Sequence, residues 1–99
     1  MYLILLHYKS DLKTVDSFVP EHTRFLQKNY DRGTFLMSGR RIPRTGGVIV
    51  ARAESVDELW AIIKEERFYI NGVSEYEIIL FSASMTAPDL ESYKEAIPQ

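Results

Sequence analysis

The sequence predicts a single α+β domain of the ferredoxin-like kind, in which an antiparallel four-stranded sheet carries two helices on one face. The chain has 99 residues, a length that suits one hydrophobic core. Hydrophobic residues make up 45% of it and charged residues 26%, as in ordinary globular proteins, which argues against disorder. Patterns of apolar residues typical of strands and helices follow one another in the order β-α-β-β-α-β.

The first half of the chain is predicted to form a strand, a helix and a second strand. Residues 2–8 are a nearly continuous apolar run, which is typical of a buried or central strand. Between residues 16 and 32, apolar side chains recur at helical spacing, and we expect the regular helix to begin near Phe18. Gly33 can end this helix in the left-handed conformation. Residues 34–42 form the second strand.

A short turn joins the second and third strands. Pro43 and the pair Gly46-Gly47 are turn-forming residues. Residues 47–53 are mostly small or β-branched and are predicted to form the third strand. Because the connection is short, we expect these two strands to pair as an antiparallel hairpin.

A second helix and a fourth strand complete the pattern. Ser55 can cap the N-terminus of the helix, and Glu58, three residues later, is its capping-box partner. We expect this helix to end near Glu65. Asn71-Gly72 is a strong turn signal, and residues 73–82 follow it with the alternation of a strand.

Two helices on one face leave the other face of the sheet uncovered, and many of its residues are apolar. A face of that kind is seldom exposed in a monomer. We therefore expect a second copy packed face to face, as a two-fold homodimer or part of a higher homo-oligomer. Residues 84–99 form a tail, in which a short amphipathic helix is predicted to clamp onto this subunit or its mate; it is marked by Pro88, Leu90, Tyr93 and Ile97.

Composition and motifs exclude several classes of function. The chain has no cysteine, so disulfides, thiolate catalysis and cysteine zinc sites are impossible. A net charge of −2 gives no support for binding nucleic acid. The apolar run at residues 2–6 is far shorter than the roughly 20 residues that span a bilayer, so we expect a cytoplasmic protein without membrane contact. The two histidines lack metal-motif spacing, so no metal site is predicted.

His22 is the strongest candidate for chemistry. It is a titratable group on the helical stripe that faces the sheet, where it could act as a base or an acid. The alternative is a half-buried histidine bonded to a backbone carbonyl. A strand hydroxyl, from Ser38 or Tyr8, is one possible partner for a neutral His22. His7 is next to Tyr8 on the first strand, and only one of these two can face the helices.

Three arginines, Arg40, Arg41 and Arg44, follow one another on the second strand and its loop. Arginine binds carboxylate and phosphate groups well, so these residues could hold an anionic substrate. The alternative is a solvated loop rim. The aromatic residues are expected to serve core and dimer packing, because the third strand carries none of the rings that RNA-binding versions of this fold use.

Several motifs, in the same order and spacing, resemble the YciI-like (YCII) family over about residues 1–83. The resemblance implies a dimeric α+β barrel, with residues 84–99 as a separate tail. It also implies an enzyme with a His/Asp pair in a cleft, and His22 matches that histidine. The motifs are Leu5–Tyr8, Pro20–Leu26, Asp31–Gly39, Gly47–Val50, Ser55–Leu59, and the series Phe68, Gly72–Val73 and Tyr76–Ile78.

The chain departs from that family at the expected Asp-Pro step. Glu66 stands where the aspartate is expected, and Arg67 replaces the proline before Phe68. Glutamate keeps the charge but is one methylene longer, and catalytic geometry is sensitive to shifts of about 0.5 Å. We expect the cation of Arg67 to lower the pKa of the Glu66 carboxyl and to compete with His22 for it. The pair is either retuned or no longer functional.

The resemblance implies lyase-like or dehydrochlorinase-like chemistry without a cofactor, on a small anionic or aromatic metabolite bound between the helices and the sheet edge. In that hypothesis His22 is the base or acid and Glu66 orients it. Arg40 or Arg67 would hold a negative group, and the remaining lining would come from Tyr8, Ser38 and Phe68. One alternative is a non-catalytic ligand-binding or assembly module. Another is an oxygenase of the related barrel families, either cofactor-free or haem-handling.

Overall fold

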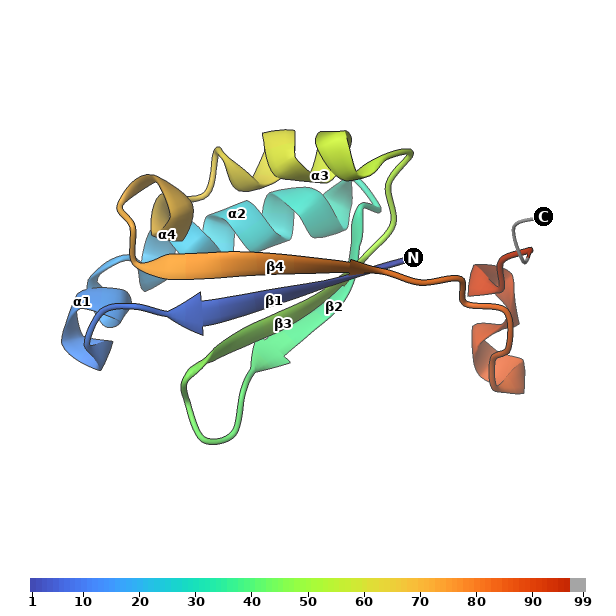
Figure 1. The fold of residues 1–99 in the computed structure, drawn as a ribbon, viewed down its shortest axis with the longest axis horizontal. Coiled ribbons are helices and arrows are strands. Elements are labelled where there is room, and N and C mark those ends of the chain that lie inside the picture. The colour runs from blue at the N-terminus through green and yellow to red at the C-terminus, as the bar shows by residue number, and fades with distance from the viewer. Residues whose placement is uncertain (97–99) are drawn as a thin grey trace.

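The chain forms one antiparallel four-stranded sheet with the strand order β2-β3-β1-β4 (Figure 1). A computed structural model describes residues 1–96. This is the predicted ferredoxin-like α+β arrangement, with strand boundaries that differ from the sequence prediction by at most two residues. The strands are β1 (Tyr2–Tyr8), β2 (Phe35–Arg40), β3 (Gly46–Ala51) and β4 (Ser74–Leu80).

All four α-helices lie on one face of the sheet or at its end (Figure 1). Side chains alternate along β1, so Ile4 and Leu6 point under the helices and are buried. Leu59, Ile63 and Phe68 cover them from the helix layer and are equally buried. The helices are α1 (Leu12–Ser17), α2 (Val19–Asp31), α3 (Val56–Ile63) and α4 (Arg67–Ile70).

Two short helices, α1 and α4, were not predicted. Asp11 caps α1 by accepting a hydrogen bond from the Thr14 amide at 2.8 Å. This helix ends at Ser17, and α2 begins directly after Phe18 with Pro20 in its first turn, where a missing amide proton costs little. The second short helix, α4, precedes the predicted Asn71-Gly72 turn, in which Gly72 has a φ of 64°.

The predicted caps of α3 are present with one change of partner. Ser55 accepts a hydrogen bond from the Glu58 amide at 3.2 Å, as a capping box requires. The Glu58 carboxylate accepts from the amide of Glu54 at 2.9 Å rather than from that of Ser55. At the other sharp connection, β2 and β3 form the expected antiparallel pair, and Gly46 is required because a Cβ there would overlap the Leu6 carbonyl.

The sheet face opposite the helices, called the open face here, has an apolar region and a charged end. At the charged end, His7 Nε2 lies 3.6 Å from Glu77 Oε1, and Lys9 Nζ lies 3.6 Å from Glu75 Oε1. From the strand registers and the alternation of side chains, the open face consists of Leu3, Leu5, His7, Met37, Val48, Val50, Glu75, Glu77 and Ile79.

The tail lies against this subunit at one end of the sheet (Figure 1). Its helix η1 (Pro88–Tyr93) is a 3-10 helix. Glu95 anchors it by accepting from the Ala83 amide and from the Met1 ammonium, both at 2.9 Å. Ile97 of the predicted amphipathic pattern lies outside the described residues. Within residues 1–96, no helix has the length and apolar character needed to cross a membrane.

Candidate functional site

The first turn of α2 positions His22 at the boundary between the helix layer and the sheet. Its amide donates to the Phe18 carbonyl at 3.0 Å, which fixes the start of the helix. The side chain is 17% exposed, and its Nδ1 lies 2.9 Å from Oε1 of Glu66. The structure therefore brings together the two residues that the sequence proposed as a pair.

Glu66 joins α3 to α4, and its side chain is 0% exposed. Its amide donates to the Ile63 carbonyl, while its own carbonyl accepts from Tyr69 and Ile70, so the backbone is held on both sides. A buried carboxylate is costly unless it is paired and hydrogen-bonded. His22 occupies one carboxylate oxygen, and the Tyr76 hydroxyl donates a short hydrogen bond to the other.

Tyr76 of β4 is the third member of this cluster. Burial raises the pKa of its phenol well above the ordinary value, and the neighbouring charge of Glu66 raises that pKa further. The phenol is therefore a proton donor to Glu66. An ionised carboxylate can only accept, so the His22 tautomer that fits carries its proton on Nδ1 and leaves Nε2 as the basic nitrogen.

Phe68 fixes the plane of the imidazole. Its ring stacks on that of His22 with centroids 4.2 Å apart and planes inclined by 11°. The ring of Tyr8 packs edge-on against Phe68, with ring centroids 6.1 Å apart. Tyr8 thus supports the site through Phe68 and is not the hydrogen-bond partner of His22.

A small hollow of about 60 Å³ lies beside His22. It is lined by Leu6, His22, Leu26, Ser38, Gly39, Gly47, Val48 and Ile49. Ser38 forms a short hydrogen bond with the Tyr30 hydroxyl and none with His22. A second hollow of about 230 Å³ lies on the other side of β2 and β3, where Met37, Val48 and Val50 of the open face line it together with Arg40.

The remaining cationic candidates lie apart from the pair. Arg67 begins α4 with an exposed side chain, and within residues 1–96 no ion pair joins it to Glu66. The expected competition between Arg67 and His22 is therefore wrong in this structure, because both oxygens of the buried carboxylate are already bonded. Arg44 instead pairs with Asp16, and Arg41 lies 3.2 Å from His7 Nδ1.

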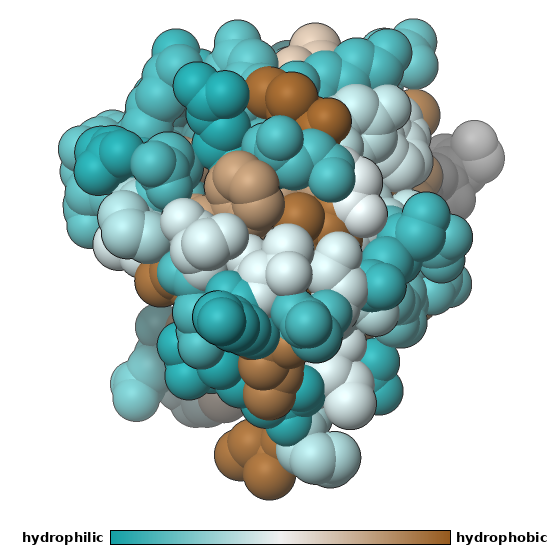
Figure 2. All heavy atoms as spheres, turned by 90° about the vertical axis from the view of Figure 1, so that its left-hand side faces the viewer, coloured by the Kyte–Doolittle hydropathy of each residue, from teal (hydrophilic) through white to brown (hydrophobic). Residues whose placement is uncertain are grey.

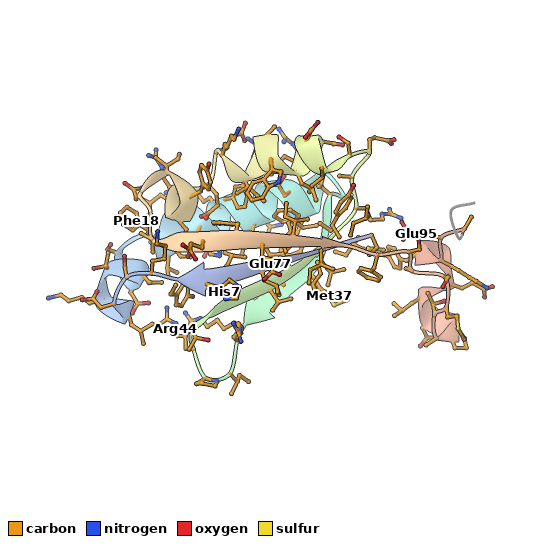
Figure 3. The ribbon with its side chains drawn as sticks, in the orientation of Figure 1. His7, Phe18, Met37, Arg44, Glu77 and Glu95 are labelled. Carbon is orange, nitrogen blue, oxygen red and sulfur yellow. The ribbon has the colours of Figure 1, made fainter. Side chains whose placement is uncertain are left out.

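His7 is separated from His22 by the sheet. It lies with Glu77 on the open face (Figure 3). Among the residues that the structure describes, no group of three or more potential metal-ligating side chains is present.

The role of Tyr76 was not predicted from the sequence. The alternation in the last strand places Tyr76 on the same side as Ile78, which was visible in the sequence. Which buried group its hydroxyl reaches depends on the register of β4 against β1, where Tyr76 lies opposite Leu6, and on the position of Glu66 above the sheet.

Comparisons with known proteins identify a family and a structure of related fold. The family model for the YCII-related domain matches residues 1–82. Among solved structures, 5-chloro-2-hydroxyhydroquinone dehydrochlorinase from Burkholderia phenoliruptrix AC1100, in complex with 2,5-dihydroxybenzoquinone, superposes with a TM-score of 0.68. The two chains are 15% identical, and the match covers 82% of this chain and 93% of the dehydrochlorinase, a likeness that shows the fold. No curated protein matches the chain.

Proposed function

The chain belongs to the YCII-related domain family, and from that premise we propose that it is an acid–base enzyme with His22 as its proton acceptor. The observation that carries the proposal is the contact of 2.9 Å between His22 Nδ1 and a Glu66 carboxylate that is 0% exposed. A structural histidine on a core helix needs only a backbone carbonyl. A buried negative charge behind Nδ1 instead stabilises the imidazolium that forms when Nε2 accepts a proton.

The proposed reaction is the elimination of HX from a small hydroxylated ring. The reacting species is the keto tautomer of the ring, in which the carbon that bears the leaving group also carries a hydrogen and is tetrahedral. Nε2 of His22 accepts a proton from this tautomer, the electron pair of that bond forms a new double bond, and the leaving group departs from the tetrahedral carbon as an anion. His22 then releases the proton to water, so one proton and one anion leave for each substrate consumed. Glu66 stabilises the charged imidazolium, and Tyr76 holds Glu66. No cofactor is required, because the histidine itself moves the proton.

The small hollow at His22 favours a flat substrate. This hollow of about 60 Å³ admits only the reacting edge of a ring, so the rest of the substrate would lie outside it. Arg40 lies two residues beyond Ser38 on β2 and would hold an anionic oxygen beside this hollow. A dihydroxybenzoquinone bound to a dehydrochlorinase of the same fold supports this substrate class.

The proposal includes a homodimer in which a second copy covers the open face. The apolar half of that face, with Leu3, Leu5 and Val50 at its centre, would otherwise remain in water. Face-to-face pairing removes this surface in both copies at once.

Chloride release from a panel of chlorinated hydroquinones tests the reaction. We expect the wild-type chain to release chloride above the buffer rate, and His22→Gln to lower that release by at least about a hundredfold. His7→Gln is the matched control, because His7 lies on the opposite face of the sheet, and its rate should stay within about twofold of wild type. Equal rates for His22→Gln and wild type would refute the assignment of His22.

One observation favours a second candidate function, a non-catalytic binding module. The hollow at His22, at about 60 Å³, is far below the roughly 300 Å³ at which small-molecule sites begin. Calorimetry with 2,5-dihydroxybenzoquinone separates the two functions. Saturable binding that His22→Gln weakens, together with no chloride release from any chlorinated hydroquinone, would favour the module.

A further inference from the structure

The turn between β2 and β3 ends in an exposed apolar side chain. This turn, residues 41–45, is called the hairpin tip here, and its Ile42 is 98% exposed. Arg40 and Arg41 precede Ile42, and neither forms an ion pair within the described part of the chain, whereas Arg44 is paired with Asp16. Brown apolar side chains stand among teal polar ones at this lower end of the molecule (Figure 2). The hairpin tip is thus an apolar knob with positive charge beside it.

The tail encloses an apolar hollow against the open face. This tail hollow has a volume of about 240 Å³, more than a single aliphatic side chain needs. Its lining includes Met37 and Val50 from the sheet, Phe81 directly after β4, and Leu90 and Tyr93 from the tail. The adjacent residues Asp89 and Glu91 of η1 are exposed and form no ion pair among residues 1–96. The tail hollow is therefore apolar inside; Asp89 and Glu91 flank its Leu90 along the chain, and the guanidinium of Arg52 lies 5.1 Å from the ring of its Tyr93.

The hairpin tip and the tail hollow lie at opposite ends of the same face. In Figure 1, the β2–β3 turn and η1 both project to the side away from the helices, one toward each end of the long axis. In Figure 3, Arg44 and Glu95 mark these two ends, with Met37 between them. The lining of the tail hollow includes none of residues 41–45, so the hairpin tip does not fill the tail hollow of its own chain.

We infer that the hairpin tip of each protomer docks into the tail hollow of a second copy. A two-fold axis parallel to the sheet and perpendicular to the long axis superposes the two open faces and exchanges the two ends. That operation brings each Ile42 to the partner's tail hollow, and the arginines at the tip toward the partner's η1, the helix that carries Asp89 and Glu91. This docking rests on the face-to-face pairing proposed above. It adds that the hairpin tip and the tail hollow determine how the two sheets are oriented relative to each other.

A second copy of this chain, related by one two-fold rotation, accounts for both the hairpin tip and the tail hollow. In a two-fold interface every contact occurs twice, so a surface must carry both a feature and its complement. The hairpin tip and the tail hollow are both apolar, and the arginines next to the tip are opposite in charge to Asp89 and Glu91 of η1. An unrelated partner would explain only one of the two.

Engineered cysteines test the contact directly, because the chain has no cysteine of its own. The double variant Ile42→Cys/Leu90→Cys should form a disulfide-linked dimer under mild oxidation, seen on a non-reducing gel. The control Ile42→Cys/Ile70→Cys should not, because Ile70 is in α4 on the helix side of the sheet. Equal crosslinking of the two pairs, or no crosslinking in either, would overturn the inference.

Sedimentation separates the failure of this inference from the failure of the pairing itself. Ile42→Asp should raise the dimer dissociation constant at least about tenfold, whereas Ile70→Asp, at a residue 54% exposed, should leave it unchanged. A wild-type monomer at all concentrations would refute both the pairing and the docking. A stable dimer that Ile42→Asp does not weaken would refute the docking alone.

Discussion

Glu66 has no exposed surface, yet both of its carboxylate oxygens are bonded. Placing an ion in a protein interior costs several kcal/mol, which the fold recovers only when the geometry of its partners is good. The Glu66 carboxylate lies between α2 and β4 and reaches His22 with one oxygen and Tyr76 with the other. The cluster of His22, Glu66 and Tyr76 is therefore needed for the stability of the fold as well as being a candidate catalytic site.

Replacing Tyr76 by phenylalanine should destabilise the fold by about 2–3 kcal/mol, because it leaves one oxygen of a buried carboxylate without a donor. Urea unfolding followed by the fluorescence of Trp60 measures this loss. The matched control is Tyr69→Phe, since the Tyr69 side chain is exposed and its hydroxyl has no hydrogen bond among the described residues. Equal losses in the two variants would contradict the role of the Tyr76 hydroxyl.

Replacing Glu66 by glutamine removes the negative charge of this side chain while keeping its size and shape. The amide oxygen can still accept from His22 Nδ1, and the amide nitrogen can donate to the Tyr76 oxygen, so we expect the urea midpoint to change little. The imidazolium would lose its counter-charge, however, and chloride release in the proposed reaction should fall by about 10³–10⁴-fold. A variant that retains a tenth or more of the wild-type rate would show that the carboxylate charge is not required.

At the residue scale, the sequence could predict the pair but not its environment. His22 was visible as a titratable group on an apolar stripe, and Glu66 entered through a family resemblance. The expected interference by Arg67 failed for a reason that lies in three dimensions: α4 turns this side chain outward and the adjacent Glu66 inward. Tyr76 was missed because alternation fixes the face of a strand but not the atoms that a side chain reaches across it.

At the element scale, the long periodic segments were predictable and the short ones were not. The helix α2 spans more than three turns, so its stripe is distinct, and Ser55 marks the start of α3. The helices α1 and α4 have six and four residues, too few to establish a period. Tertiary contacts determine them instead: α4 forms where the buried Phe68 completes the core.

The tail is an element whose attachment depends on pH. The Ala83 amide, and next the Met1 ammonium, hold the pKa of the Glu95 carboxyl below its ordinary value of 4.5. A lowered pKa in the folded state means that this carboxylate stabilises the tail above pH 4.5 and loses that effect as the pH falls through the lowered value. The Ala83 amide resonance in NMR spectra should therefore shift with a midpoint below 4.5.

Glu95→Gln is the control for that titration, since it keeps an acceptor oxygen but removes the ionisation. The Ala83 amide should then no longer titrate between pH 5 and 2. A midpoint above 4.5 in the wild-type chain would have the wrong sign for a carboxylate held in its ionised form.

At the scale of the whole molecule, a chain of 99 residues has one core, and that core lies between the helices and one face of the sheet. The antiparallel four-stranded sheet followed from the element order, because few topologies accommodate two β-α-β units in one sheet. The distribution of charge over the open face did not follow from it. His7, Glu75 and Glu77 make one end of this face polar, so an apolar contact must be centred toward the tail.

If a second copy covers the open face, the thermal stability of the protein depends on its concentration. Unfolding of a dimer releases two chains, so mass action should raise Tm by roughly 3–6 °C for each tenfold rise in concentration. Ile79→Asp, which places a charge in the apolar part of the open face, should abolish this dependence, whereas Ile70→Asp on the helix side should preserve it. Differential scanning calorimetry over a hundredfold range of concentration measures both. A wild-type Tm that does not change over that range would mean that the open face is stable in water, and its apolar centre would then need another explanation.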